Sequence, residues 1–170
     1  IAIRKAKLLV KIGLGLESWL GPLIENGASP DLQIITSSTG VPLIFGGGHA
    51  HGSRRETGNP HIWLDPENVK IMIRPVTEAL VRIDPSHQTD YQKNEAALIV
   101  ALDGLTREMI AKVAELPARG VVTHHSAWPY FARRFGFSIV GEIQTQAGSE
   151  PSARWIGTLI QRIRKEKVGV

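Results

Sequence analysis

Apolar and polar residues alternate along the chain in blocks that predict an α/β fold. Short apolar runs, typical of buried strands, occur at residues 8–12, 32–36, 121–123 and 137–140, and another begins at Val168. Between them apolar residues recur at helical spacing, which predicts helices at about 16–25, 66–83, 88–116, 128–135 and 152–165. Strands that alternate with helices in this order build parallel sheets covered by helices.

The helix predicted at about 88–116 is the longest of these elements. At a rise of 1.5 Å per residue it would extend for ~40 Å, which exceeds the usual helix of a single domain. A rigid helix of this length can connect two lobes of one protein.

Composition and charge narrow the class of protein. The 170 residues are 42% hydrophobic and 21% charged, as in ordinary globular proteins, and suffice for one domain or pieces of two. The net charge of +4 is scattered and accompanies no nucleic-acid-binding motif, so we expect no nucleic-acid partner. The absence of cysteine excludes disulfide scaffolds and cysteine-ligated zinc.

The two ends of the chain do not resemble natural termini. The chain begins Ile1-Ala2-Ile3 without a methionine or a leader, and it ends at the start of an apolar run. We therefore expect further segments of the protein on both sides, and weak metal binding from this portion alone.

Histidines are the main candidate ligands, because neutral imidazole offers a lone pair at physiological pH. His125 follows the strand predicted at 121–123, and ligands gather at the carboxyl ends of strands in open α/β sheets. A satisfied core histidine is the alternative there. His124 should point the other way, and we interpret it as structural. His61 precedes the helix predicted at 66–83, where periodicity alone favours a hydrogen-bonded loop residue.

The remaining motifs carry weaker signals. His49 and His51 lie in a glycine-rich loop and either collect metal weakly or are simply solvated. Gly46-Gly47-Gly48 is not followed by Lys-Ser/Thr, so no P-loop is present. Ser126 lacks the surroundings of a nucleophile elbow, and no HExxH motif occurs. Hydrolase chemistry is therefore disfavoured.

Four segments form an ordered set of motifs. They are GLGLE at 13–17, HIWLDP at 61–66, VTHHSAWPYFARRFG at 122–136 and SEPSA at 149–153. In this order they resemble the NGLxLE, HxWLDP, VTxHDAFGYF and EPSA motifs of the zinc- and manganese-type (TroA-like) solute-binding proteins of metal ABC importers. The resemblance covers essentially the whole chain. Ser126 and Pro129 depart from it, replacing an Asp and a Gly.

The resemblance implies two Rossmann-like α/β lobes joined by a long helix, with the metal between them and each lobe only partly present in this chain. Residues 1–87 would be the later part of the N-terminal lobe, including the first metal histidine. Residues 88–117 would be the linking helix, and residues 118–170 the early part of the C-terminal lobe.

The resemblance also implies a ligand set. The family usually supplies four ligands: His61 matches the second and His125 the third, while the first lies upstream of this chain and an acidic fourth lies downstream. Histidine in the third place is common in zinc-type members, so Zn²⁺ is the expected ion and Mn²⁺ the second choice. Glu17 is a candidate acceptor for a ligand imidazole.

The function implied is extracytoplasmic capture of the metal and its delivery to an ABC permease of the inner membrane, without enzymatic activity. Such a protein would be periplasmic or a membrane-anchored lipoprotein, and a monomer at full length. Two alternatives stay open: a metal-dependent enzyme using the same histidines, and an adhesin-like surface lipoprotein active in cell adhesion.

Overall fold

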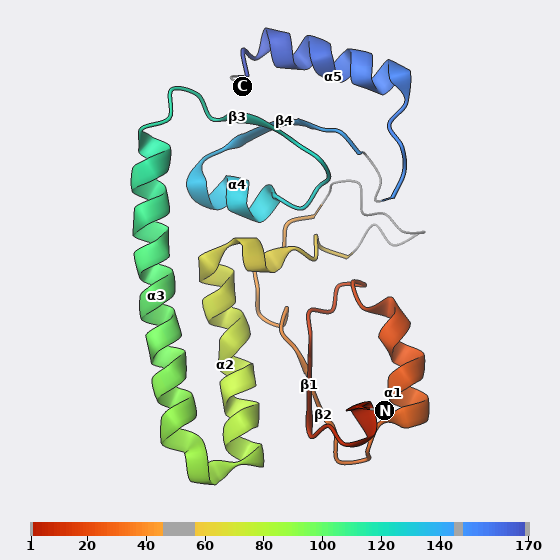
Figure 1. The fold of residues 1–170 in the computed structure, drawn as a ribbon, viewed down its shortest axis with the longest axis vertical. Coiled ribbons are helices and arrows are strands. Elements are labelled where there is room, and N and C mark those ends of the chain that lie inside the picture. Colours follow the sequence, from red (N-terminus) through yellow and green to blue (C-terminus); the bar gives the residue numbers. More distant parts are fainter. Residues whose placement is uncertain (1, 46–56, 145–147, 169–170) are drawn as a thin grey trace. The chain divides into compact units, whose positions relative to one another are not determined.

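The computed structural model describes residues 2–45, 57–144 and 148–168. Helices and strands alternate along it (Figure 1): β1 (Leu8–Lys11), α1 (Gly21–Gly27), β2 (Gln33–Thr36), α2 (Pro66–Ile83), α3 (Gln88–Ala114), β3 (Gly120–Thr123), α4 (Pro129–Phe135), β4 (Ser138–Glu142) and α5 (Ala153–Lys165). Short 3₁₀ turns occupy Ala2–Arg4, Ser18–Leu20, Ile62–Leu64 and Pro85–His87. The predicted α/β class is confirmed. No helix within the described ranges is long and apolar enough to span a membrane.

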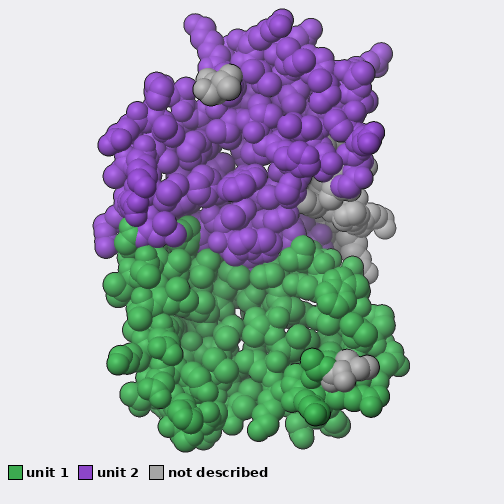
Figure 2. Space-filling model, in the orientation of Figure 1, with its two compact units in different colours: residues 1–42, 66–104 green, residues 43–65, 105–170 purple. Residues whose placement is uncertain are grey.

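The chain forms two compact units (Figure 2). Unit 1 contains residues 1–42 and 66–104, and unit 2 contains residues 43–65 and 105–170. The chain thus passes from unit 1 to unit 2, back, and forward again, and α3 contributes residues to both. These units are defined by contacts within this chain, so the predicted lobe boundaries after residues 87 and 117 stay predictions.

Unit 1 contains one parallel strand pair. β1 and β2 are in register from Leu8 opposite Gln33 to Lys11 opposite Thr36. The pair lies between α1 and α2 (Figure 1), and α2 packs against both strands. A short strand, a helix and a parallel strand in sequence is the arrangement that the apolar pattern predicted.

Unit 2 repeats this arrangement with β3 and β4, which are parallel from Gly120 opposite Ser138 to Thr123 opposite Glu142, with a register shift between Val121 and Val122. Helices α4 and α5 both contact β4 and lie on opposite sides of the pair (Figure 1). Helix α4 ends at Gly136, whose φ of 75° gives the left-handed cap that glycine adopts without strain.

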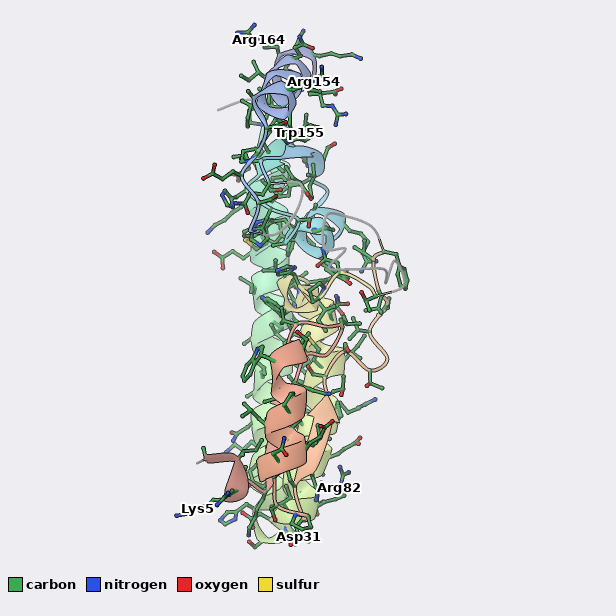
Figure 3. All side chains as sticks on the ribbon, turned by 90° about the vertical axis from the view of Figure 1, so that its right-hand side faces the viewer. Lys5, Asp31, Arg82, Arg154, Trp155 and Arg164 are labelled. Carbon is green, nitrogen blue, oxygen red and sulfur yellow. The ribbon has the colours of Figure 1, made fainter. Side chains whose placement is uncertain are left out.

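Helix α5 is attached to the end of β4 through its first turn. Ser152 caps the helix by accepting a hydrogen bond from the backbone N–H of Trp155. The Trp155 side chain lies on the side of α5 that faces β4 (Figure 3), and its Nε1–H donates to the carbonyl oxygen of Glu142 at 2.9 Å. The carboxyl end of β4 is therefore held by the helix that follows it.

The helix predicted at 16–25 begins later than expected. Gly13, Leu14 and Gly15 have positive φ values of 84°, 56° and 84°, and α1 starts only at Gly21. The Glu17 carboxylate accepts hydrogen bonds from the backbone N–H groups of Ile12 (2.8 Å) and Gly13 (2.9 Å). These bonds fold the segment into a tight turn, which the apolar spacing could not reveal.

The strand predicted to start at Val168 falls almost entirely on residues 169 and 170, so it stays a prediction. The Val168 N–H donates to the carbonyl oxygen of Ile163 at 3.1 Å, so this residue folds back onto the end of α5. Residues 169 and 170 lie outside the described residues.

Candidate metal centre

His61 lies on a segment that is anchored on both sides. It directly precedes the 3₁₀ turn Ile62–Leu64, in which the Ile62 side chain is completely buried. Asp65, which is 1% exposed, follows the turn and accepts a hydrogen bond from Arg134 Nε at 2.6 Å. A buried carboxylate needs such a partner, and this pair connects the His61 segment to α4.

His125 follows β3 directly, at the carboxyl end where the sequence predicted it. Beyond the last residue of β3, the ladder continues through a hydrogen bond from the Gln144 N–H to the His124 carbonyl oxygen at 2.7 Å. The Ala127 N–H then donates to the carbonyl oxygen of His125 at 2.8 Å, which closes a tight turn. The backbone of His125 is therefore fixed before the chain enters α4.

The structure brings the two predicted ligands together. The ring centroids of His61 and His125 are 5.4 Å apart, with an angle of 65° between the rings. Two imidazoles that bind one zinc ion at about 2.0–2.1 Å in tetrahedral geometry have centroids separated by about 5 Å. The observed spacing therefore fits a shared ion. The two histidines come from segments of unit 2 that are far apart in sequence.

The other histidines do not join this pair in the same way. His124, interpreted as structural from the sequence, is exposed, with its ring centroid 6.0 Å from that of His125. His87 lies in unit 1, and its Nδ1 is 2.7 Å from Asp84. His49 and His51 lie outside the described residues. Within those residues, no three His, Asp or Glu side chains gather as a metal site.

Asn59 is a residue of this centre that the sequence interpretation missed. It is 3% exposed, and its Oδ1 lies 3.0 Å from the backbone nitrogen of His61 and 2.9 Å from His61 Nδ1. Its Nδ2 donates to the carbonyl oxygen of Ser126 at 2.5 Å. The one signal in the sequence was its place two positions before a candidate ligand, because its burial is known only from the structure. Glu17, predicted as an imidazole acceptor, instead accepts hydrogen bonds within its own turn.

Tyr130 supports the main chain of the same region. Its side chain is completely buried; the hydroxyl donates to the Asn59 carbonyl oxygen at 2.8 Å and accepts from the Ile44 N–H at 3.1 Å. Burial raises the pKa of Tyr130, and the hydrogen bond from Ile44 opposes that shift. The phenol therefore stays protonated and keeps donating.

Glu142 adds a carboxylate at the carboxyl end of β4, opposite Thr123 in the ladder. Burial raises the pKa of Glu142, whereas the charge of His125 acts to lower it. A partly desolvated carboxylate near His125 makes this end of the sheet favourable for a cation. The rule that placed His125 at a strand end applies equally to Glu142 and could have found it.

An apolar cavity of about 160 Å³ lies on the α4 side of the strand pair; its lining is Val121, Thr123, Trp128, Phe131, Ala132, Phe137 and Ile139. The hydroxyl oxygen of Thr123 is its one polar feature of note, because it is buried and has no hydrogen-bond partner among the described residues. With no ionisable residue in its lining, the cavity has no donor set for a metal.

Comparison with known proteins identifies the family. Residues 1–170 match the family model described as the zinc-uptake complex component A, periplasmic (ZnuA). The chain belongs to this family. The resemblance inferred from four ordered motifs is therefore confirmed.

Members of the ZnuA family resemble the chain in sequence and in fold. The high-affinity zinc uptake system protein ZnuA of Brucella abortus is 35% identical over 61% of this chain and 31% of its own length. The manganese ABC transporter substrate-binding lipoprotein PsaA of Streptococcus anginosus is 29% identical over 96% of this chain and 54% of its own. A crystal structure of ZnuA superimposes with a TM-score of 0.85 at 28% identity, covering 98% of this chain and 62% of that one.

The same comparisons show how much of each relative the chain covers. Where nearly the whole chain is matched, it spans 54% of the length of the Streptococcus protein and 62% of the ZnuA crystal structure. The chain thus has the α/β fold of ZnuA-type solute-binding proteins over the portion that it covers.

Proposed function

We propose that the full-length protein captures Zn²⁺, or Mn²⁺ as the second choice, and delivers it to an ABC permease of the inner membrane. The observation that carries this proposal is the pairing of the His61 and His125 rings at 5.4 Å. Two nitrogen donors at this spacing suit a borderline-soft ion such as zinc better than magnesium or calcium. The names of the relatives support the same two ions, zinc for the Brucella protein and manganese for the Streptococcus protein.

His61 and His125 supply two of the four ligands in this proposal, and the other two come from parts of the protein outside this chain. The ion lies between two lobes and is the cargo of the protein. Glu142 interacts electrostatically with His125, and a bound cation would favour the ionised form of this carboxylate, which burial disfavours. Neutral imidazoles bind the ion, so acidification that protonates them releases it.

We place the protein outside the cytoplasmic membrane, in the periplasm or as an anchored lipoprotein, as a monomer that binds no nucleic acid. The family consists of binding proteins of ABC importers, which favours capture over catalysis. A metal-dependent enzyme would need an open coordination position and a general base. An adhesin role has only the weak support of one structural neighbour, the laminin-binding adhesin of Streptococcus agalactiae at 26% identity.

Calorimetric titration of zinc into the full-length protein tests the proposal. We expect tight one-to-one binding in the wild type. In a His61→Ala, His125→Ala double variant the affinity should fall by more than about 100-fold, the upper end of what losing an outer-shell partner costs. His124→Ala is the matched control, because this neighbouring histidine is exposed and should leave binding unchanged. Equal affinity in the double variant would refute the proposed site.

A further inference from the structure

One buried amide contacts both segments that carry the candidate ligands. Asn59 Oδ1 faces the backbone N–H of His61 at 3.0 Å and Nδ1 of the same residue at 2.9 Å. Asn59 Nδ2 faces the carbonyl oxygen of Ser126, the residue after His125, at 2.5 Å. Because Asn59 is 3% exposed, bulk water cannot readily replace these partners.

These partners allow only one orientation of the Asn59 amide. A backbone N–H can only donate, and a carbonyl oxygen can only accept. Rotating the amide by half a turn would place its NH₂ against the His61 N–H and its oxygen against the Ser126 oxygen. Both contacts would then be repulsive, so Oδ1 must face His61.

The orientation of the amide fixes the tautomer of the His61 ring. Oδ1 has no hydrogen, so the Nδ1 atom 2.9 Å away must be the donor. In a neutral imidazole only one nitrogen carries a hydrogen, and the lone pair is then on Nε2. Nε2 is therefore the nitrogen through which His61 can bind a metal ion.

We propose that Asn59 is a positioning residue for metal binding, an inference that rests on the proposed function. Its oxygen selects Nε2 of His61 as the donor atom. Its NH₂ group holds the turn after His125 at a fixed distance from the same amide. One side chain thus sets both the protonation of one ligand and the spacing between the two.

Tyr130 provides a matched control for this role. Its hydroxyl also bonds to Asn59, but only to the backbone oxygen, at 2.8 Å, and to the Ile44 N–H. A Tyr130→Phe variant therefore removes two buried hydrogen bonds from the same region without altering the amide that faces the ring. A merely structural role for Asn59 would make the two variants behave alike.

The first test measures the ring ¹⁵N chemical shifts of His61 in zinc-free full-length protein at about pH 9, well above the ordinary histidine pKa of about 6.5. We expect a single tautomer with hydrogen on Nδ1 in the wild type and in Tyr130→Phe, and a mixture in Asn59→Ala. Asn59→Asp retains an acceptor for Nδ1 and should restore the single tautomer, even if Asn59→Ala proves too unstable to study. Hydrogen on Nε2 in the wild type would overturn the proposal.

The second test measures zinc affinity of the same proteins by calorimetry. Asn59→Ala should bind zinc about 10–100-fold more weakly, as is usual when an outer-shell partner of a histidine ligand is lost, and Tyr130→Phe should bind like the wild type. Equal losses in both variants would overturn the role of Asn59. A wild type that binds no zinc would instead refute the proposed function itself, which separates the two failures.

Discussion

Both units contain a strand, a helix and a parallel strand, but the loop after the first strand has a different role in each. Each has a parallel strand pair between helices, with polar residues soon after its first strand. In unit 1 both oxygens of Glu17 accept backbone N–H groups of the turn that follows β1. In unit 2 the backbone after β3 is satisfied by Asn59 and by Ala127, and the ring of His125 lies beside that of His61. A side chain at the end of a strand can act as a metal ligand when other groups make the hydrogen bonds that the nearby backbone needs.

The largest expected effect comes from the buried ion pair of unit 2. Arg134→Ala leaves the carboxylate of Asp65, which is 1% exposed, without this partner, and breaking a buried pair in this way costs about 3–5 kcal/mol. Denaturant unfolding of the zinc-free full-length protein measures the loss. Lys70→Met in unit 1 is the comparison, because its partners Glu67 and Asp103 are 40% and 43% exposed and such pairs contribute about 0–1 kcal/mol. Similar losses in both variants would contradict the distinction.

Alanine substitutions at two glycines of the unit 1 turn distinguish backbone strain from steric crowding. Gly13 and Gly15 both have a φ of +84°. A Cβ added at Gly13 would lie 2.6 Å from Thr36 Cγ2, whereas a Cβ added at Gly15 would have no described heavy atom within 4 Å. Gly15→Ala should therefore cost about 1–2 kcal/mol for the left-handed backbone alone. Gly13→Ala should cost about 1–3 kcal/mol more for overpacking. Chemical denaturation of the two variants side by side measures this, and equal values would show that Thr36 moves aside.

Glu17 and His125 test the difference between the two loops directly. Glu17→Ala removes two hydrogen bonds to a charged acceptor and should lower the free energy of unfolding by about 1.5–3 kcal/mol. His125→Ala should change the stability of the zinc-free protein by less than about 1 kcal/mol, as for most substitutions away from a packed core. Unfolding monitored by circular dichroism provides both values. A loss of unfolding free energy well above about 1 kcal/mol in His125→Ala would indicate that this residue has a structural role.

The smallest effect concerns the turn between α2 and α3. The hydrogen bond from Ser86, and then those with His87 and Tyr91, hold the pKa of Asp84 below its ordinary value, against an opposing contribution from desolvation. A lowered pKa in the folded state stabilises above the unfolded value of about 3.9, and this stabilisation is lost as pH falls through the folded pKa.

Asp84→Asn should therefore be less stable than the wild type near neutral pH, with a difference that shrinks below about pH 4. Unfolding curves recorded at several pH values measure this dependence. A difference that is constant with pH would show that the Asp84 hydrogen bonds do not depend on its charge.

Much of the fold was predictable because proline and glycine set the ends of helices through local backbone conformation. Asp65-Pro66 and Asp84-Pro85 bracket α2, and the helix predicted at about 88–116 is observed as α3 at Gln88–Ala114. The start of α1 was wrong because a carboxylate, and not apolar periodicity, determines the turn before it.

The candidate centre was predictable only in part. A motif and a strand end pointed to His61 and His125, and their ligand role stays a prediction. Asn59 and the pair between Asp65 and Arg134 were missed, because each depends on a partner from another segment that periodicity cannot identify. A residue beside a candidate ligand is therefore worth examining even when it has no pattern of its own.

The hydrogen bond between Asn59 and Ser126 has a consequence for the order of folding. Its partners are 67 residues apart in sequence, and those of the bonds from Tyr130 to Asn59 and from Arg134 to Asp65 are 71 and 69 apart. Contacts of such separation carry the entropic cost of closing a long loop, so we expect them to form after the local contacts within each helix. His61 and His125 lie on the same two segments, so their rings meet only when this loop closes. A partly folded or truncated chain would therefore present single imidazoles and hold zinc weakly.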